Sequence, residues 1–496
     1  MRSLLTQSAG SSGPGPVAAL LATGVALLAV LFLPLCASAG VVIRVPLDQP
    51  TIEAGLGAAT SGDTVRVDCN TYYESALTLP DGVVLEAAGW DSGCVVIDGG
   101  TRATILTCNG NTSGTVRNIT FRDGSGTQGG AVYASNATVT FDYCFFRHND
   151  ATTGGAIYWS GGNPDIVGCT FSHNTTPNSG GGVAFFQTGG TVVGCRFEYN
   201  EAQIGGGAFS NLLGTTTAFT ECEFYQNTAT SWMQGGGGVY NGQQVATSYL
   251  HCQFVENDAL EGGGAYNAVK SQPTFTGCGF DTNEAGSYGG AVYGYDDSAT
   301  FTECEFTHND CELGSGGGLY LNKSDIEMDF CTLYMNDAIA GGGIQAIDNS
   351  TLDIESCTIV ENSVDATRAV GGAGLLISGT TVATIDQTII AFNRGGEALK
   401  CGDTATATLT CTNVAGNDGG NWTGCIAGQE GMGGNLAVGP RICNVLAYEL
   451  YLCANSPCLP SGNDCGVLVG AWYEGCGACD SPVQRKSWGA LKALYR

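Results

Sequence analysis

The sequence predicts an all-β fold, a parallel β-helix with about 26 residues per coil, from three observations. A cysteine recurs nine times at spacings of 25 to 30 residues, and an asparagine stands five residues after each one without exception. The segments between them are short runs of alternating apolar residues broken by Gly, Asn and Ser, which is typical of strands and turns. A fixed period of this length indicates a solenoid rather than a globular domain. The cysteines are Cys144, Cys169, Cys195, Cys222, Cys252, Cys278, Cys304, Cys331 and Cys357.

Two further matched positions surround each cysteine. The residue two after it is Phe in seven copies, then Leu333 and Ile359, and the residue three before it is also apolar. Because side chains alternate along a strand, these two apolar positions have opposite parity, and both can face inward only if the chain bends between them. A second strand is expected from pieces such as Gly129–Tyr133 and Gly289–Tyr293. We therefore expect two or three short strands per coil, with neighbouring coils ~4.8 Å apart.

Stacking turns each repeated residue into a column. A column of Asn amides can satisfy buried turn groups, since each amide both donates and accepts. The asparagines are Asn149, Asn174, Asn200, Asn227, Asn257, Asn283, Asn309, Asn336 and Asn362. A column of Cys fills a narrow interior stripe, and parallel side chains make poor disulfide geometry, so free buried thiols are favoured. The glycine pairs allow positive φ at corners.

Residues 1–39 are expected to be a secretory signal peptide. An apolar run, Val17–Leu35, is followed by Ala37-Ser38-Ala39, an A-x-A cleavage pattern. An uncleaved single-span anchor is the alternative. No later apolar run is long enough to cross a membrane as a helix, so no transmembrane helix is expected in the mature chain. We expect the mature chain to be secreted or held in the cell envelope, with the outer membrane surface as one such location.

Residues 40–395 are expected to form the parallel β-helix, with regular repeats over about 118–395. Near its start, Thr51–Leu85 opens with a short amphipathic helix pattern followed by Gly62-Asp63 and a strand at Val65–Val67. Such a helix would cap the first coil and protect its edge. Cys69, Cys94 and Cys108 are candidates for a disulfide in these coils.

Residues 396–480 are expected to form cysteine-rich C-terminal coils and a cap. Nine cysteines without a common period indicate disulfides of undetermined pairing with one thiol left over, and a zinc site at Cys476-x-x-Cys479 is a weaker alternative. Residues 481–496 form a basic tail, which is either frayed or a sorting or docking tag. The cysteines are Cys401, Cys411, Cys425, Cys443, Cys453, Cys458, Cys465, Cys476 and Cys479.

The charge balance limits the partners. The chain has 46 acidic and 18 Lys and Arg residues, a formal net charge of −28. Nucleic acid and anionic membranes are disfavoured, and a polyanionic sugar would need a divalent cation or a basic patch. No cofactor is expected, Ca²⁺ is the weaker alternative, and the chain is expected to be monomeric.

The "GGA[V/I]Y" and "FxxN" elements, such as Phe146-Arg147-His148-Asn149 and Phe171-Ser172-His173-Asn174, resemble the repeats of polymorphic outer membrane proteins. More broadly, residues 45 to 395 resemble right-handed β-helix proteins of the pectin-lyase-like fold. The first resemblance implies an exported surface protein concerned with adhesion. The second implies the fold, which also occurs in polysaccharide lyases and hydrolases.

An enzyme of that fold would need recognisable residues. A lyase needs clustered acids that hold Ca²⁺ and a Lys or Arg base, and an inverting hydrolase needs two carboxyl groups ~6.5–9.5 Å apart. The Gly-His-Gly and Arg-x-Lys elements of the hydrolases do not occur. Asp296-Asp297 is more simply explained as a turn, and Lys270 and Lys323 would serve as bases only if acids of neighbouring coils converge on them. The enlarged coil around Thr230–Gly238 is where a hidden cleft would lie.

Three further columns of repeated residues are candidate sites. His148, His173 and His308 share one position, for which a surface pair is favoured over a metal site. The acids directly after the ladder Asn predict an outward acidic stripe, or else a loose Ca²⁺ surface. The aromatic residues that follow the glycine pairs are expected to pack inward rather than to stack on sugars. The acids are Asp150, Glu201, Asp258, Glu284, Asp310 and Asp337, and the aromatic residues are Tyr133, Tyr158, Phe185, Tyr240, Tyr266, Tyr293 and Tyr320.

The sequence assigns no catalytic, cofactor-binding or metal-binding residue. It favours an exported, non-enzymatic β-helix that presents a surface for adhesion or for binding a glycan or another cell-surface ligand. The alternative is a polysaccharide lyase or glycoside hydrolase, because a fold does not decide function.

Overall fold

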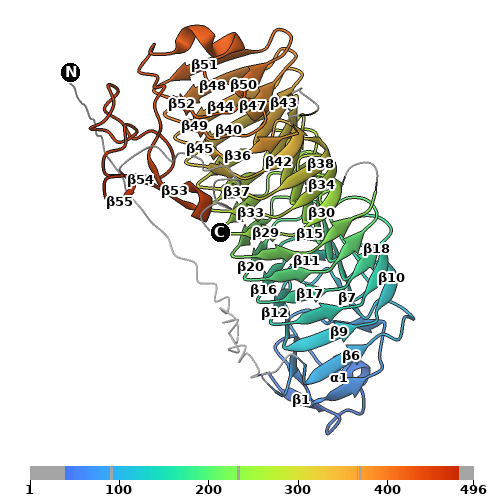
Figure 1. The fold of residues 1–496 in the computed structure, drawn as a ribbon. Coiled ribbons are helices and arrows are strands. Elements are labelled where there is room, and N and C mark those ends of the chain that lie inside the picture. The colour runs from blue at the N-terminus through green and yellow to red at the C-terminus, as the bar shows by residue number, and fades with distance from the viewer. Residues whose placement is uncertain (1–39, 90–92, 232–234, 366, 368–370, 480–496) are drawn as a thin grey trace, which may run out of the picture. The chain divides into compact units, whose positions relative to one another are not determined.

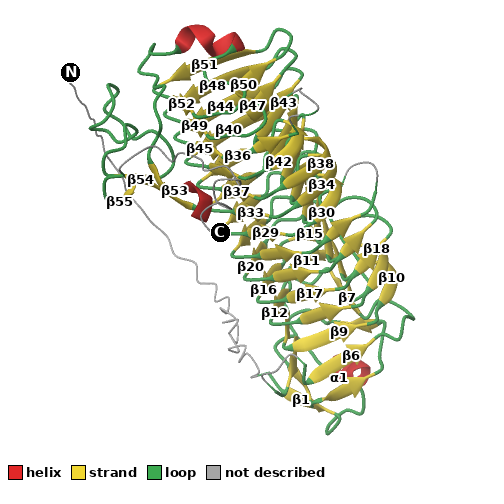
Figure 2. Cartoon of the chain, viewed as in Figure 1, coloured by secondary structure: helices red, strands yellow, loops and turns green. Residues whose placement is uncertain are grey.

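The computed structural model describes residues 40–89, 93–231, 235–365, 367 and 371–479, whose strands form a parallel β-helix (Figures 1 and 2). A regular coil passes through four short strands, one in each of four sheets that we name A to D. The predicted all-β solenoid is confirmed. A regular coil thus contains four strands, whereas two or three were expected, because the residues directly after the ladder Asn also pair from coil to coil.

Sheets A and B have 15 and 14 strands. Sheet A contains β1 (Val42–Val45), β2 (Thr64–Val67), β5 (Val84–Ala87), β8 (Thr115–Arg117), β12 (Thr140–Asp142), β16 (Asp165–Val167), β20 (Thr191–Val193), β24 (Ala218–Thr220), β28 (Ser248–Leu250), β32 (Thr274–Thr276), β36 (Thr300–Thr302), β40 (Asp325–Asp329), β44 (Thr351–Glu355), β48 (Val382–Asp386) and β51 (Thr406–Thr410). Sheet B contains β3 (Asn70–Tyr72), β6 (Val95–Asp98), β9 (Ile119–Arg122), β13 (Phe145–Arg147), β17 (Thr170–Ser172), β21 (Arg196–Glu198), β25 (Glu223–Tyr225), β29 (Gln253–Val255), β33 (Gly279–Asp281), β37 (Glu305–Thr307), β41 (Thr332–Tyr334), β45 (Thr358–Val360), β49 (Ile389–Ala391) and β52 (Asn413–Ala415).

Sheets C and D have 13 and 10 strands. Sheet C contains β4 (Leu77–Thr78), β7 (Leu106–Asn109), β11 (Val132–Ala137), β15 (Ile157–Gly162), β19 (Val183–Phe186), β23 (Phe209–Leu212), β27 (Val239–Asn241), β31 (Ala265–Asn267), β35 (Val292–Tyr295), β39 (Leu319–Asn322), β43 (Ile344–Ile347), β47 (Gly372–Ile377) and β50 (Glu397–Cys401). Sheet D contains β10 (Ser125–Gln128), β14 (Asp150–Thr153), β18 (Thr175–Thr176), β22 (Glu201–Ala202), β26 (Thr228–Ala229), β30 (Asp258–Glu261), β34 (Glu284–Tyr288), β38 (Asp310–Ser315), β42 (Asp337–Ala340) and β46 (Ser363–Val364).

The repeated residues form continuous interior columns. Phe146, Phe171 and Phe197 stack with ring centroids 4.7 Å apart at each step. All nine repeat cysteines are buried free thiols, as predicted. The bend between sheets A and B is made by the residue before each cysteine, such as Tyr143, whose φ of 49° is left-handed. This bend turns both apolar positions of the repeat into the core.

The glycine pairs are required by close coil stacking as much as by positive φ. Gly154 has a φ of 64°, as expected for a corner. At the second glycine, Gly155, a Cβ atom would lie 2.1 Å from the backbone oxygen of Gly181 in the next coil. Any side chain there would push the coils apart.

The N-terminal end is capped as predicted. Helix α1 (Ile52–Ala58) is N-capped by Thr51, whose side chain accepts a hydrogen bond from Ala54 N at 3.1 Å. Ile52 and Leu56 are buried in the core of the first coils. A disulfide joins Cys69 to Cys94, while Cys108 is a buried thiol.

At the other end, regular strands run on to β52, and the short 3-10 helix η1 (Gly424–Gln429) contacts β50 and β51. Its Ile426 is buried in the same core. Beyond it the chain folds back as β53 (Ile442–Asn444), the 3-10 helix η2 (Val445–Ala447), β54 (Glu449–Cys453) and β55 (Glu474–Cys476). We call residues 441–479 the fold-back segment.

Four disulfides hold the cysteine-rich region 396–479, and one of its nine cysteines, Cys458, is a buried free thiol. The prediction of a stapled cap with one thiol left over is therefore confirmed. The pairs are Cys401–Cys425, Cys411–Cys465, Cys443–Cys476 and Cys453–Cys479.

The expected signal peptide at 1–39, residues 232–234 of the enlarged coil and the basic tail at 481–496 lie outside the described residues. Within the described part of the chain, no helix has the length and apolar character to cross a membrane.

Candidate ligand-binding site

Asp296 and Asp297 do not form a surface pair. Asp296 is exposed at a left-handed corner, whereas Asp297 is 2% exposed and points inward. Burial raises the pKa of Asp297 to about 7, and the neighbouring Ser324 and Asn267 side chains lower it in part. The two carboxyl groups face opposite sides of the chain, so they cannot act together on a substrate.

Lys270 and Lys323 are exposed corner residues in their respective coils. The Lys323 ammonium lies over the ring of Tyr295, 5.8 Å from its centroid. Neither lysine forms an ion pair with a described carboxylate, so acids do not converge on them as a lyase base would need.

The acidic stripe runs along sheet D as expected. Asp258, Glu284, Asp310 and Asp337 lie in register on four consecutive coils. Burial, followed by the charges of Asp337 and Glu284, raises the pKa of Asp310 to about 6. Among the described residues, no three of these carboxylates converge closely enough to hold one ion.

The histidines form a surface stack. The rings of His148 and His173 lie 5.2 Å apart, and the His173 ring lies 5.0 Å from that of Tyr199. His308 lies 3.4 Å from a carboxylate oxygen of Asp281. The positions are those of a surface aromatic ladder, with no third ligand beside His148 and His173 in the described chain.

The tyrosines after the glycine pairs do not pack into the core as expected. Tyr266, Tyr293 and Tyr320 are 4 to 7% exposed, but they form a separate cluster on the outer side of sheet C. There Tyr288, from a long strand of sheet D, contacts Tyr293 and Tyr320. Phe185 alone of the set points into the core, because it pairs with Trp159 and Ala184 occupies the tyrosine column. Parity along the strand, which differs by one residue at Phe185, decides which side each ring faces.

Cys476 and Cys479 lie beside Cys443 and Cys453, and the Sγ atoms of Cys443, Cys453 and Cys476 lie within 4.8 Å of one another. In the structure these four cysteines are joined as two disulfides. The C-x-x-C spacing therefore serves adjacent crosslinks.

A hollow lies where the fold-back segment meets sheet B. It has a volume of about 280 Å³ and is lined by Glu303, Glu305, Phe330, Thr332, Ala471, Trp472 and Tyr473. Glu303 and Phe330 are left-handed corner residues before β37 and β41, and Glu305 and Thr332 begin those strands. We call this hollow the aromatic pocket.

Hydrogen bonds fix both sides of the aromatic pocket. The Trp472 indole donates to Thr332 Oγ1 at 2.9 Å, and Ala471 N donates to Thr358 Oγ1 at 2.9 Å. The Tyr448 hydroxyl donates to Glu305 Oε2 at 2.7 Å, and burial and the Glu305 charge raise the pKa of Tyr448. Trp472 and Glu305 are therefore held in place before any ligand binds.

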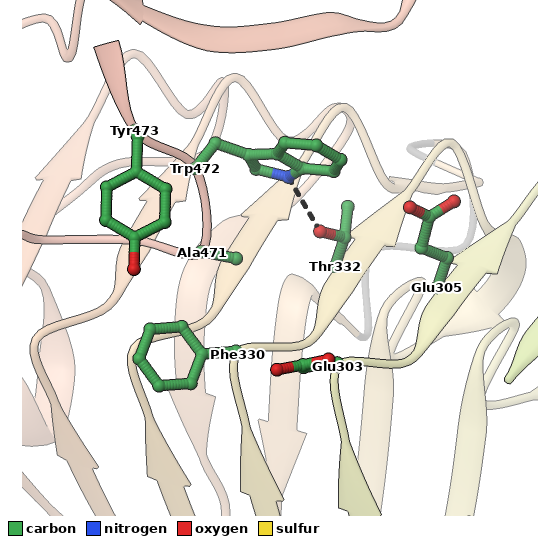
Figure 3. Close-up of a pocket in the computed structure, with 7 residues that line it drawn as sticks. All are labelled: Glu303, Glu305, Phe330, Thr332, Ala471, Trp472 and Tyr473. Atoms are coloured by element: carbon green, nitrogen blue, oxygen red, sulfur yellow. Dashed lines mark hydrogen bonds between the residues drawn. The ribbon is translucent and has the colours of Figure 1, made fainter. Parts of the chain in front are cut away.

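The pocket presents rings on one side and carboxylates on the other. Figure 3 shows Phe330, Trp472 and Tyr473 around the hollow, with Glu303 and Glu305 facing it from the neighbouring coil. Phe330 and Tyr473 are 36% and 66% exposed, so their faces are open to solvent. Exposed ring faces stack on the apolar faces of sugars, and carboxylates accept hydrogen bonds from hydroxyl or ammonium groups.

Sequence analysis missed this site, because its two halves are about 140 residues apart. One signal was present. The third position of the sheet B strands faces outward and is polar at Arg147 and Glu198, but it is a buried Tyr334 and Val360 in later coils. Outward apolar residues indicate that another segment covers them, and a cluster of the fold-back segment does so.

Comparison with known proteins supports the fold. No curated protein sequence matches the chain. The family model described as a right handed beta helix region matches residues 103–280 and 262–418, which together span well over half of the 496 residues. The chain therefore belongs to the right-handed β-helix family.

Proposed function

We propose that this protein is an exported, non-enzymatic β-helix surface protein that binds a glycan in the aromatic pocket. The observation that carries the proposal is the pairing of three partly exposed rings with two carboxylates in one preformed hollow. The expected export and the resemblance of the repeats to surface proteins support the adhesive role.

Polysaccharide hydrolysis is the second candidate. Glu303 and Glu305 face the same hollow, and two carboxyl groups are the minimum that a hydrolase needs. Lyase chemistry has less support, since none of the described residues that line the pocket is a Lys or an Arg.

The test is a binding and cleavage screen of the protein against neutral, amino-sugar and uronate oligosaccharides, read by Trp fluorescence and by product analysis. We expect binding without cleavage. Phe330→Ala or Trp472→Ala should weaken binding at least ten-fold. Tyr143→Ala is the matched control, because Tyr143 is an exposed aromatic at the equivalent corner of a distant coil.

Two outcomes would change the conclusion. Cleavage that Glu303→Gln or Glu305→Gln abolishes would make the protein a hydrolase. Equal glycan affinity of the Trp472→Ala and Tyr143→Ala variants would show that the aromatic pocket does not bind the glycan.

A further inference from the structure

An acidic surface adjoins the aromatic pocket. On the outer side of sheet A, Asp329 and Glu355 lie in register, and Glu355 pairs in turn with Asp386. Glu327 and Asp353, each two residues earlier in the same strands, form a parallel column on the same side of the sheet. With Asp325, these six residues make up what we call the acidic strip, on β40, β44 and β48.

The acidity of the strip is local to these three coils. In the strands of sheet A before them, the position equivalent to Glu327 is occupied mainly by Thr, as at Thr140, Thr191, Thr274 and Thr300. The position equivalent to Asp329 is Thr276 and Thr302 in the two preceding coils. The strip is therefore not a simple consequence of the net charge of the whole chain.

The strip is hollowed and continuous with the pocket. A second hollow of about 250 Å³ lies against Asp325, Glu327 and Asp353. Asp329 directly precedes Phe330 of the aromatic pocket, and its backbone oxygen accepts from Glu303 N at 2.9 Å. Burial, followed by the Glu303 charge, raises the pKa of Asp329, so one carboxyl group of the strip interacts with one of the pocket.

The strip lacks positive partners. Within the described chain, none of its six carboxylates forms an ion pair, and no Lys or Arg lines either hollow. One carboxylate oxygen of Asp329 and one of Asp386 are out of contact with solvent and accept no hydrogen bond. The other four carboxylates of the strip, those of Asp325, Glu327, Asp353 and Glu355, are exposed and can be reached by a ligand that carries donors and positive charge.

We propose that the ligand is a cationic amino-sugar polymer, with sugar rings on the aromatic pocket and ammonium groups along the acidic strip; this rests on the proposed glycan binding. Carboxylates recur once per coil at ~4.8 Å, which suits a polymer that bears a charge at each unit. A basic peptide fits less well, because its backbone amides would find no partner on strands that are already paired on both sides.

The test measures binding of the full chain to four probes at about pH 6, where amino-sugar and carboxyl groups are both charged. The probes are a β-1,4-linked glucosamine hexamer, its N-acetylated form, an oligogalacturonate and polylysine. We expect the glucosamine hexamer to bind at least ten-fold more tightly than the N-acetylated hexamer, and the oligogalacturonate not to bind. Affinity should fall as salt rises.

Variants separate the strip from the pocket. The double variant Glu327→Gln, Asp353→Asn should weaken glucosamine binding about ten-fold. The matched control is Asp150→Asn, Glu201→Gln, which removes two exposed charges from sheet D and should change nothing.

The failures are distinguishable. If both hexamers bind equally through Trp472 and the strip variant is unchanged, this inference is wrong and the proposed glycan binding stands. If neither hexamer binds, this inference is wrong, and the proposed glycan binding is wrong as well only when the neutral and uronate oligosaccharides of the screen also fail to bind. If polylysine binds and both hexamers do not, the strip recognises basic protein instead.

Discussion

Asn257 shows how one repeated residue joins three coils. Its backbone N and its Nδ2 both donate to Asn283 Oδ1, at 3.0 and 2.9 Å, and Nδ2 also donates to the backbone oxygen of Phe224 at 2.8 Å. Asn227 makes the same bonds to Asn257 Oδ1. The side-chain amide of Asn257 is therefore fully paired, both as donor and as acceptor, as an amide column requires.

Asp297 is a buried acid that interrupts a polar interior column. Asn211, Asn241 and Asn267 form a second ladder inside sheet C, with side-chain hydrogen bonds of 3.1 and 2.9 Å. The next coil has Gly294 at that position, and a Cβ there would lie 2.5 Å from Asp297 Oδ1. The Asp297 carboxyl thus fills the space that an Asn would occupy.

Asp297→Asn should stabilise the protein at high pH. The folded pKa of about 7 lies above the ordinary value of 3.8, so the folded chain holds the proton more tightly. The contribution of this carboxyl group to the free energy of unfolding is therefore largest at low pH and is lost as the pH rises from about 4 to about 8. The amide carries no charge, and we expect a gain of about 1–3 kcal/mol at pH 8 in chemical unfolding, with little change at pH 4.

The exposed neighbour is the control for this prediction. Asp296→Asn removes the same charge at the surface and should change the free energy of unfolding by less than about 0.5 kcal/mol. An Asp297→Asn protein that gains nothing at pH 8 relative to pH 4 would contradict the buried-charge explanation.

At the scale of elements, the fold-back segment is held by a small core of its own. Leu450, Leu452, Ile442 and Val469 pack with Tyr334, Val360 and Ile389 on the outer side of sheet B. This core is separate from that of the coils, and it positions Trp472 and Tyr473 at the aromatic pocket. The site therefore depends on docking of this segment.

Leu452→Ala should loosen the fold-back segment without unfolding the coils. Leu452 is 1% exposed, and truncation of a buried Leu costs about 2–5 kcal/mol. Hydrogen exchange should speed up over residues 441–479 and stay slow in β11 to β31, and glycan binding should weaken. Leu446→Ala is the control, because Leu446 is 57% exposed in the same segment. Equal exchange in both variants would show that the segment does not rely on this core.

The coil elements could be predicted from the sequence because they are local. The Asn ladder, the Cys column, the corner glycines and the capping helix each follow from residues within one repeat. The predicted inward packing of the tyrosines was wrong, because each tyrosine directly follows a core residue such as Val292 and therefore faces outward. Phe185 is shifted by one residue and faces inward. The aromatic pocket needs residues 303–332 and 471–473 together, and no periodic pattern connects them.

At the scale of the whole molecule, each coil contacts chiefly its two neighbours. Strands of a sheet pair with those of the coils before and after, such as β29 with β25 and β33. The stability of such a stack is approximately a sum over coils and the contacts between neighbours. The fold then requires that neighbouring coils stay in register, and it does not require any one particular coil.

This view predicts that one whole coil can be removed. Deleting residues 252–277 joins His251 to Cys278, and His251 and Gly277 occupy the same left-handed corner, with φ of 52° and 59°. Asn227 would then bond Asn283, as Asn257 does now. We expect a folded protein with a β-type circular dichroism spectrum and a melting temperature lowered by only about 5 °C. Deleting residues 252–264, half a coil, would join a sheet A–B corner to β31 of sheet C and place every later column out of register. That variant should fail to fold or aggregate. If both deletions behave alike, contacts between coils do not depend on register, and the columns are not what holds the solenoid together.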